Sequence, residues 1–242
     1  NTLLQTLSAT WELPHTQCDE CFGPILTVYV YTVHIQHDAD EVFLFILNLI
    51  QKQTDDKILT LYKISVETHV QCLQCDSVQT KENYLLTLPL HVKEDHTSLE
   101  QCLTSFFEEH ELRGINCCFC VQCAYTIFHL QGVQLLSLPP ILCIQLKRYR
   151  NNGRFTQKLG YEVTFPETFD LSTTVPHQPC KYTLYAVVVH SGSAGFGHYT
   201  AYVRHRDTQS WYFADDSHTR QVSWDKVQTS YGGDGQTPYI LI

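Results

Sequence analysis

The sequence predicts an α+β fold with an antiparallel sheet, and three observations support this class. Helical patterns come early in the chain, whereas most of the later sequence reads as strands. Clusters of Gly, Pro, Asn and Asp separate these strand-like runs. The chain has 242 residues, of which 43% are hydrophobic. This is enough for a large core in one domain with insertions, or at most two domains.

Two helices are predicted in the first quarter of the chain. Residues 1–13 carry leucines at helical spacing. Residues 38–53 give a stronger pattern, because Asp38 can cap the helix and Glu41 follows three residues later. The apolar run over residues 42–50 is nearly continuous, so we expect this helix to be buried on most faces. Its outer face is expected to carry Asp40 and Leu44.

A third helix is predicted over residues 97–112. Thr97 and Glu100 match a capping box. The apolar stripe of this helix comprises Leu99, Cys102, Leu103, Phe106 and Phe107.

The strand-like runs are rich in Val, Ile, Leu, Thr and Tyr. They cover residues 62–70, 82–92, 126–136, 140–149, 182–191, 198–205, 210–215 and 238–242.

Charge and cysteine content limit the possible functions. The formal net charge is -9, which disfavours binding to nucleic-acid phosphates. No apolar run is long enough for a membrane span, and the N-terminus does not resemble a secretory signal. The 11 cysteines are an odd number and include Cys-x-x-Cys pairs, which argues against a disulfide framework. We therefore expect a reducing compartment, the cytoplasm or the nucleus.

Two of the cysteine pairs predict a structural zinc site. Cys72 and Cys75, and then Cys120 and Cys123, each lie in a polar turn between strand-like runs. Together they supply four thiolates, the ligand set of a tetrahedral zinc. The alternative is that they are ordinary buried thiols.

Other cysteines complicate this assignment. Cys18 and Cys21 form a third pair, which is a rival ligand set, a second partial site or no site at all. Cys102 and Cys143 fit core positions.

His198 is the strongest candidate for a catalytic base. The preceding sequence SGSAGFG is rich in glycine, so its backbone can approach a ligand closely. Asp215 and Asp216 follow one hairpin later and are expected beside His198. A carboxylate that orients an imidazole is part of a nucleophile–base–orienter triad, whose missing member would be Ser or Cys. The alternative is a structural or solvated histidine.

Five segments together resemble the ubiquitin-specific proteases, a papain-like cysteine protease family. GHYTAYVRH (197–205) and WYFADDS (211–217) are similar to its histidine box. NTLLQTL (1–7), QHDADEVF (36–43) and LPPILCIQLKRY (138–149) resemble further boxes, in the family order. The two cysteine pairs match its fingers.

The resemblance implies a right-hand architecture with a helical thumb, an antiparallel β palm and zinc-bearing β fingers. It implies one protease domain over residues 1–242. Residues 1–60 would be mainly thumb, residues 61–137 the fingers with an inserted helix, and residues 138–242 the palm with the histidine box.

The resemblance also implies roles for individual residues. A nucleophilic cysteine is expected three residues upstream of Asn1, outside this chain. His198 would be its base, Asp215 the orienter, and Asp216 a brace of the hairpin or an aid to the oxyanion. The expected substrate-binding residues are Gln36, Asp38, Gly197 and Tyr199.

The implied activity is a thiol isopeptidase that cleaves after the terminal Gly-Gly of a ubiquitin-like modifier. The chain looks most like the interferon-induced branch, which acts on an interferon-induced, two-domain modifier. Partners implied by the family are the modifier, its protein conjugates and signalling receptors. The alternatives are a general ubiquitin deconjugase, a catalytically silent scaffold and a zinc-binding interaction module.

Overall fold

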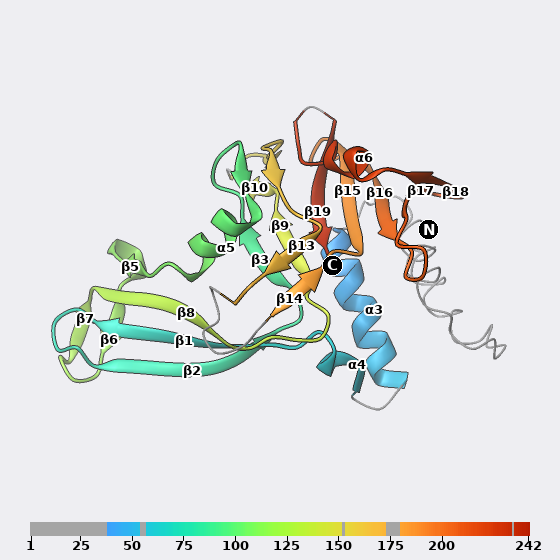
Figure 1. Cartoon of the computed structure of the whole chain (residues 1–242). Helices are drawn as coiled ribbons and strands as arrows, with labels where there is room; N and C mark the ends of the chain where they lie inside the picture. Colours follow the sequence, from blue (N-terminus) through green and yellow to red (C-terminus); the bar gives the residue numbers. More distant parts are fainter. Residues whose placement is uncertain (1–37, 54–56, 152, 173–179, 234) are drawn as a thin grey trace.

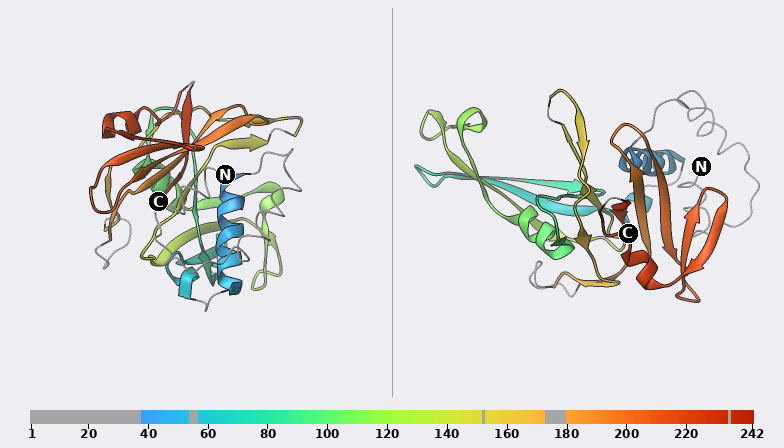
Figure 2. Two further views of the ribbon diagram at one scale, coloured as in Figure 1. Left: turned by 90° about the vertical axis from the view of Figure 1, so that its right-hand side faces the viewer. Right: turned by 90° about the horizontal axis from the view of Figure 1, so that it is seen from above.

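The computed structural model describes residues 38–53, 57–151, 153–172, 180–233 and 235–242. A long β arm projects from a body built on a seven-stranded sheet (Figure 1, Figure 2). The fold is mixed α+β and mostly strand, as predicted. The expected helix over residues 1–13, the pair Cys18 and Cys21, and Gln36 lie outside the described residues.

The seven-stranded sheet, called the main sheet below, forms the body. Its spatial order is β18 (His218–Val222), β17 (Trp211–Asp215), β16 (Gly197–Arg204), β15 (Ala186–Gly192), β19 (Gln236–Leu241), β9 (Ile144–Lys147) and β3 (Leu88–His91). All neighbours are antiparallel except β3 and β9, which are parallel. The expectation of an antiparallel sheet is therefore wrong at this one edge. A parallel pair needs a long crossover, and the chain between β3 and β9 supplies one that includes part of the arm.

The arm consists of a four-stranded sheet and a two-stranded ribbon at its tip (Figure 1). The sheet has the order β2 (Val78–Leu85), β1 (Ile64–Cys72), β8 (His129–Ser137) and β5 (His110–Leu112). The tip ribbon pairs β6 (Cys118–Cys120) with β7 (Tyr125–Ile127). Strand β2 is exposed along nearly its whole length, so the arm has little core of its own away from the body.

The described fold also contains three short strand pairs and three short helical segments. The pairs are β10 (Tyr149–Asn151) with β11 (Thr156–Lys158), β12 (Val163–Thr164) with β4 (Thr97–Ser98), and β13 (Thr168–Asp170) with β14 (Lys181–Thr183). The segments are α4 (Lys57–Thr60), the 3-10 turn η1 (Gly114–Asn116) and α6 (Trp224–Gln228). Among the described residues, the helices are too short or too polar to cross a membrane.

Helix α3 (Ala39–Gln53) packs beside the main sheet (Figure 2). Asp38 caps it, because its Oδ1 accepts a hydrogen bond from the Asp40 amide at 2.8 Å. The helix buries one face rather than most faces, and Phe45 is 43% exposed. Asp40 and Leu44 were expected on its outer face, but Asp40 is buried and Leu44 is half-buried against the sheet.

Helix α5 (Leu99–Phe107) lies at the base of the arm. Its capping box uses Ser98 and Gln101, one residue later than the predicted pair. Thr97 instead precedes the cap and pairs with Val163 in the short ladder between β4 and β12. The predicted helix also extended too far, because residues 110–112 pair with β8 as β5.

Two hydrophobic clusters hold the body together. The larger one joins the base of the arm, α5 and one face of the main sheet, with Ile64, Leu88, Leu103, Leu146 and Val187 among its buried members. The smaller cluster lies between α3 and the main sheet and includes Phe43, Leu47 and Tyr239. The expected core positions of Cys102 and Cys143 are confirmed, with exposed fractions of 4% and 0%.

Candidate functional site

His198 and Asp215 meet at one end of the main sheet. His198 is near the start of β16 and Asp215 is the last residue of the adjacent β17. The Nε2 atom of His198 lies 2.6 Å from Oδ1 of Asp215, and both side chains are about half exposed. This contact fixes the imidazole ring and leaves Nδ1 as the nitrogen that can exchange a proton with a reacting group.

Asp216 is the second carboxylate at this site. Its Oδ2 lies 4.0 Å from Nε2 of His198, farther than Oδ1 of Asp215 at 2.6 Å. Asp216 has a left-handed φ of 49° and begins the tight turn between β17 and β18. Its backbone position therefore shapes the turn that follows Asp215. The structure thus brings His198, Asp215 and Asp216 together, and their catalytic roles stay a prediction.

Gly197 has a steric reason to be glycine. A Cβ atom at this position would lie 2.2 Å from Nε2 of His190 and 2.3 Å from the Ser191 carbonyl oxygen. His190 is 1% exposed and lies in β15, where Tyr199 of β16 is its register partner. Burial and the nearby Lys158 lower the pKa of His190 to about 4, so its imidazole is neutral at physiological pH.

Three tyrosines connect this hairpin to the start of α3. The Tyr199 ring centroid lies 4.7 Å from that of His190 and 5.9 Å from that of Tyr239. Tyr149 packs on Tyr239 from another side, at 5.7 Å. The Tyr239 hydroxyl donates a hydrogen bond to Oδ2 of Asp38. Burial raises the pKa of both Tyr199 and Tyr239 above its usual range, so the cluster is neutral.

The Asp38 carboxylate therefore has two hydrogen bonds to other described residues. One carboxylate oxygen caps α3 and the other accepts from Tyr239. A carboxylate has about four acceptor positions, so the half-buried Asp38 retains capacity for a cationic partner.

Asp40 faces the opposite way, into the protein. Its carboxyl is 8% exposed. Its Oδ1 atom has no hydrogen-bond partner among the described residues. Burial raises the pKa of Asp40, and a hydrogen bond with Thr87 opposes the rise.

The four predicted cysteines meet at the tip of the arm. The Sγ atoms of Cys72, Cys75, Cys120 and Cys123 all lie within 4.8 Å of one another. Individual Sγ–Sγ distances are 3.9 Å for Cys72–Cys123 and 3.6 Å for Cys75–Cys120. The two cysteine pairs are far apart in the sequence, and the turns after β1 and β6 bring them together.

The two turns have the same backbone construction. The amide of Asp76 donates to the Cys72 carbonyl at 3.0 Å, and the amide of Ala124 donates to the Cys120 carbonyl at 2.9 Å. Asp76 and Ala124 both have left-handed φ values, 56° and 62°. This conformation folds each second cysteine back toward the first.

The donor set fits zinc. Tetrahedral coordination with Zn–S bonds of about 2.3 Å places sulfurs about 3.8 Å apart, close to the observed separations. The amide of Cys123 donates to Sγ of Cys120 at 3.5 Å, and this contact lowers the pKa of Cys120 to about 6. Cys117 and Cys118 contact backbone carbonyls instead and are not part of the cluster.

Residues that the sequence did not single out also shape the histidine site. His190 is the last buried residue of β15, in the run VVVHSG, and this position of an ionisable group was a usable signal. Lys158 and Tyr239 gave no local signal, because they reach the site from strands distant in sequence.

Comparisons with known proteins agree with these features. The family described as "Ubiquitin carboxyl-terminal hydrolase" matches residues 30–242. Human "Ubl carboxyl-terminal hydrolase 18" is 31% identical, over 86% of this chain and 62% of the relative. The mouse protein of the same name is 32% identical, over 90% of this chain and 65% of the relative. "Ubiquitin carboxyl-terminal hydrolase 19" of Arabidopsis thaliana is 30% identical, over 86% of this chain and 33% of the relative.

The chain thus spans less than two thirds of the length of these relatives. The family match nevertheless includes α3, the cysteine cluster and the His198–Asp215 pair. This chain therefore belongs to the ubiquitin carboxyl-terminal hydrolase family, whose members are cysteine proteases.

Proposed function

We propose that this chain carries the base and the modifier-binding surface of a thiol hydrolase that cleaves ubiquitin-like modifiers from proteins. The observation that carries this proposal is the 2.6 Å contact between His198 and Asp215 beside a glycine-rich turn. Family membership supplies the reaction class. The resemblance of residues 1–7 to the segment that follows the family's nucleophile supports an attacking cysteine upstream of Asn1.

The chemistry follows from the arrangement of the pair. Asp215 accepts a hydrogen bond from Nε2 of His198, so Nδ1 takes the proton of the cysteine thiol. The thiolate attacks the carbonyl carbon of the modifier's terminal glycine. His198 then donates a proton to the departing lysine amine, and water releases the acyl-enzyme. Asp216, at 4.0 Å, braces the hairpin turn.

The substrate tail would enter between α3 and the β15–β16 hairpin. Asp38, at the start of α3, has remaining acceptor capacity for an arginine of the tail. Tyr199 and Gly197, with the expected Gln36, would line a channel narrow enough to select glycine. Zinc held by the four clustered cysteines would fix the arm tip that contacts the body of the modifier.

We assign these regions to the hand described for the family. The arm strands β1, β2 and β5–β8 lie within the fingers proposed over residues 61–137, whereas β3, from the same range, lies in the main sheet. The other six strands of the main sheet lie within the palm proposed over residues 138–242, and α3 lies within the thumb proposed over residues 1–60. The nine described cysteines are free thiols, which supports a cytoplasmic or nuclear location.

The proposed substrate is the interferon-induced, two-domain modifier rather than ubiquitin. The human and mouse relatives named for a Ubl support this choice, whereas the Arabidopsis relative is named for ubiquitin. The test is kcat/KM of the full-length protein on both modifiers, each fused to the same fluorogenic group. Equal values would favour a general ubiquitin deconjugase.

The catalytic proposal is tested by His198→Ala in the full-length protein. Loss of the base should lower kcat by about 100-fold or more, while binding of the modifier persists. His205→Ala, on an exposed turn of the same sheet, is the matched control. An unreactive wild-type protein that binds the modifier would instead support a silent scaffold.

A further inference from the structure

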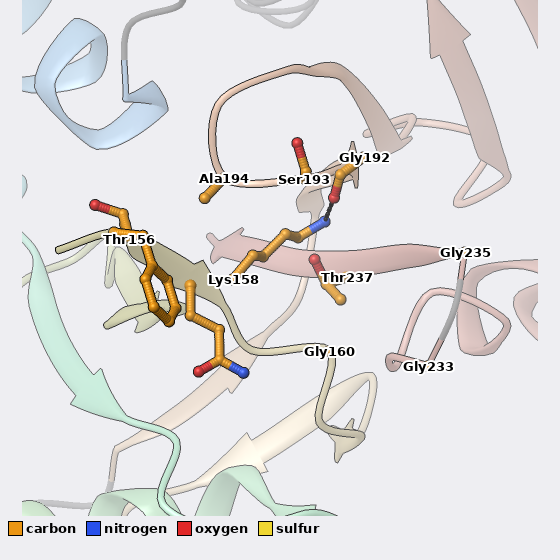
Figure 3. Close-up of a pocket in the computed structure, with 11 residues that line it drawn as sticks. Thr156, Lys158, Gly160, Gly192, Ser193, Ala194, Gly233, Gly235 and Thr237 are labelled. Carbon is orange, nitrogen blue, oxygen red and sulfur yellow. Dashed lines mark hydrogen bonds between the residues drawn. The ribbon is translucent and has the colours of Figure 1, made fainter. Parts of the chain in front are cut away.

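Lys158 reaches across from a neighbouring ribbon to the hairpin that carries His198. Its Nζ donates to the His190 carbonyl oxygen at 2.9 Å and to the Gly192 carbonyl oxygen at 3.0 Å. Figure 3 shows this side chain extended toward Gly192, with Thr237 alongside. One ammonium group therefore contacts two carbonyls of β15, of which that of His190 also accepts a hydrogen bond from Oγ1 of Thr237 at 3.2 Å.

One of these two contacts, the one to Gly192, lies beyond the last residue of β15 that pairs with β19. The ladder between β15 and β19 ends at Ser191↔Gln236, since Gln236 is the first residue of β19. Gly192 lies one residue beyond that point and pairs only with Gly197 across the hairpin among the described strands. Lys158 thus supplies a donor to Gly192 where the ladder has no further strand residue.

The backbone at Lys158 is itself held in place by pairing with β10 and by the neighbouring Arg148. Lys158 pairs with Tyr149 in the β10–β11 ribbon, and the Leu159 amide donates to the Arg148 carbonyl at 2.7 Å. Arg148 is fully buried, and its guanidinium donates to the carbonyl oxygens of Pro238, Leu159 and Tyr161. The ammonium is therefore positioned from a rigid part of the body.

The braced backbone leads directly to the catalytic pair. Ser191 is the register partner of His198, and Gly192 is the partner of Gly197. Displacement of β15 at this end would carry His198 away from Asp215 on β17. A shift of about 1 Å in a catalytic group can cost about 100-fold in rate.

We propose that Lys158 is a positioning residue that holds the β15–β16 hairpin in the geometry that brings His198 onto Asp215. This inference rests on the proposed function. Burial and the nearby Arg148 lower the pKa of Lys158 to about 8, in keeping with an amine drawn partly out of water to reach the backbone. A hollow of about 490 Å³ beside it, lined by Thr156, Gly160, Gly235 and others, leaves room for a larger cation.

The test compares Lys158→Met, Lys158→Arg and the control Lys226→Met in the full-length protein. Met keeps the length of the apolar stem and removes the donors, whereas Arg can span both carbonyls. Lys226 is an exposed lysine on α6. For Lys158→Met we expect kcat to fall about tenfold to 100-fold with little change in KM, and Lys158→Arg to restore part of it.

Amide hydrogen exchange gives a readout that does not depend on activity. In Lys158→Met, exchange over residues 190–200 should accelerate about tenfold or more, while the arm and β17–β18 stay as in the wild type. Unchanged exchange in this segment, or unchanged kcat with an active wild type, would overturn the inference. Loss of the whole fold in both Lys158 variants would also overturn it, because Lys158 would then determine the fold. If the wild type does not cleave any modifier, the proposed function fails. The amide hydrogen exchange result then tests by itself whether Lys158 holds the β15–β16 hairpin in place.

Discussion

The arm tip and the histidine hairpin hold their chemical groups by different means. At the tip, four sulfurs converge from the ends of β1 and β6 and from the turns that follow them, and neighbours such as Leu73 and Val121 are 46% and 73% exposed. At the hairpin, His198 stands on β16, next to β15, whose first five residues are all buried. The tip therefore depends on its ligand set, whereas the hairpin depends on packing. This difference predicts that each site can be disturbed without the other.

The largest expected effect is at the arm tip. Cys120→Ser removes one of the four clustered thiols, so the bound zinc should fall from about one ion per chain to nearly none. Hydrogen exchange should accelerate in β6 and β7 but not in the main sheet. Elemental analysis and exchange measurements check both parts.

Cys118→Ser is the matched control, because Cys118 lies two residues away but outside the cluster. Equal zinc loss in the two variants, or a wild type without zinc, would contradict the assignment of the ligands.

The second effect concerns the two carboxylates of the hairpin. Asp215→Ala should lower kcat by about 100-fold, because His198 loses the acceptor at 2.6 Å. Asp216→Ala should cost about tenfold or less, because its oxygen lies at 4.0 Å. Zinc content should be unchanged in both variants. A larger loss in Asp216→Ala than in Asp215→Ala would reverse the two roles.

The third effect is an acid sensitivity of the main sheet. The pKa of His190 is lowered to about 4 in the folded protein and returns to about 6.5 in the unfolded chain. The unfolded state therefore binds more protons, and stability falls as the pH drops from about 6.5 to about 4, by about 3 kcal/mol in total. His190→Asn should make this dependence shallower, whatever its effect at neutral pH.

Tryptophan fluorescence can follow this unfolding without a signal from the arm. Trp211 and Trp224 pack together at 5.5 Å beside the main sheet, and residues 61–137 contain no tryptophan. An identical pH dependence in wild type and His190→Asn would show that other groups cause the acid sensitivity.

The smallest effect returns to the tip. Ala124 has a left-handed φ of 62°, which costs a residue with a Cβ about 1 kcal/mol. Ala124→Gly should therefore stabilise the metal-free tip by about 0.5–1 kcal/mol, measured by local hydrogen exchange in the presence of a chelator. Asp76→Gly should gain less, because Asp tolerates this conformation better. A loss of stability in Ala124→Gly would mean that the lower chain entropy of alanine dominates.

Local sequence determined the chemistry-bearing residues and most of the elements. Spacing within each Cys-x-x-Cys pair, the cap at Asp38 and the alternation in the strand-like runs act over a few residues, so they can be read directly from the chain. The same local rules failed by one residue at α5. Thr97 and Ser98 are both suitable caps, and in the structure Gln101 rather than Glu100 closes the box, by accepting from the Ser98 amide.

Only the tertiary structure decided which distant groups meet. Cys120 joins Cys72 in the cluster because the turns after β1 and β6 lie together in space, whereas Cys118, two residues earlier in β6, stays outside it. Asp40 turns inward because α3 packs on the main sheet. Lys158 reaches Gly192 at the point where β19 begins one residue too late to pair with it. Such contacts depend on where strands end relative to one another in space, and no spacing along the chain encodes that position.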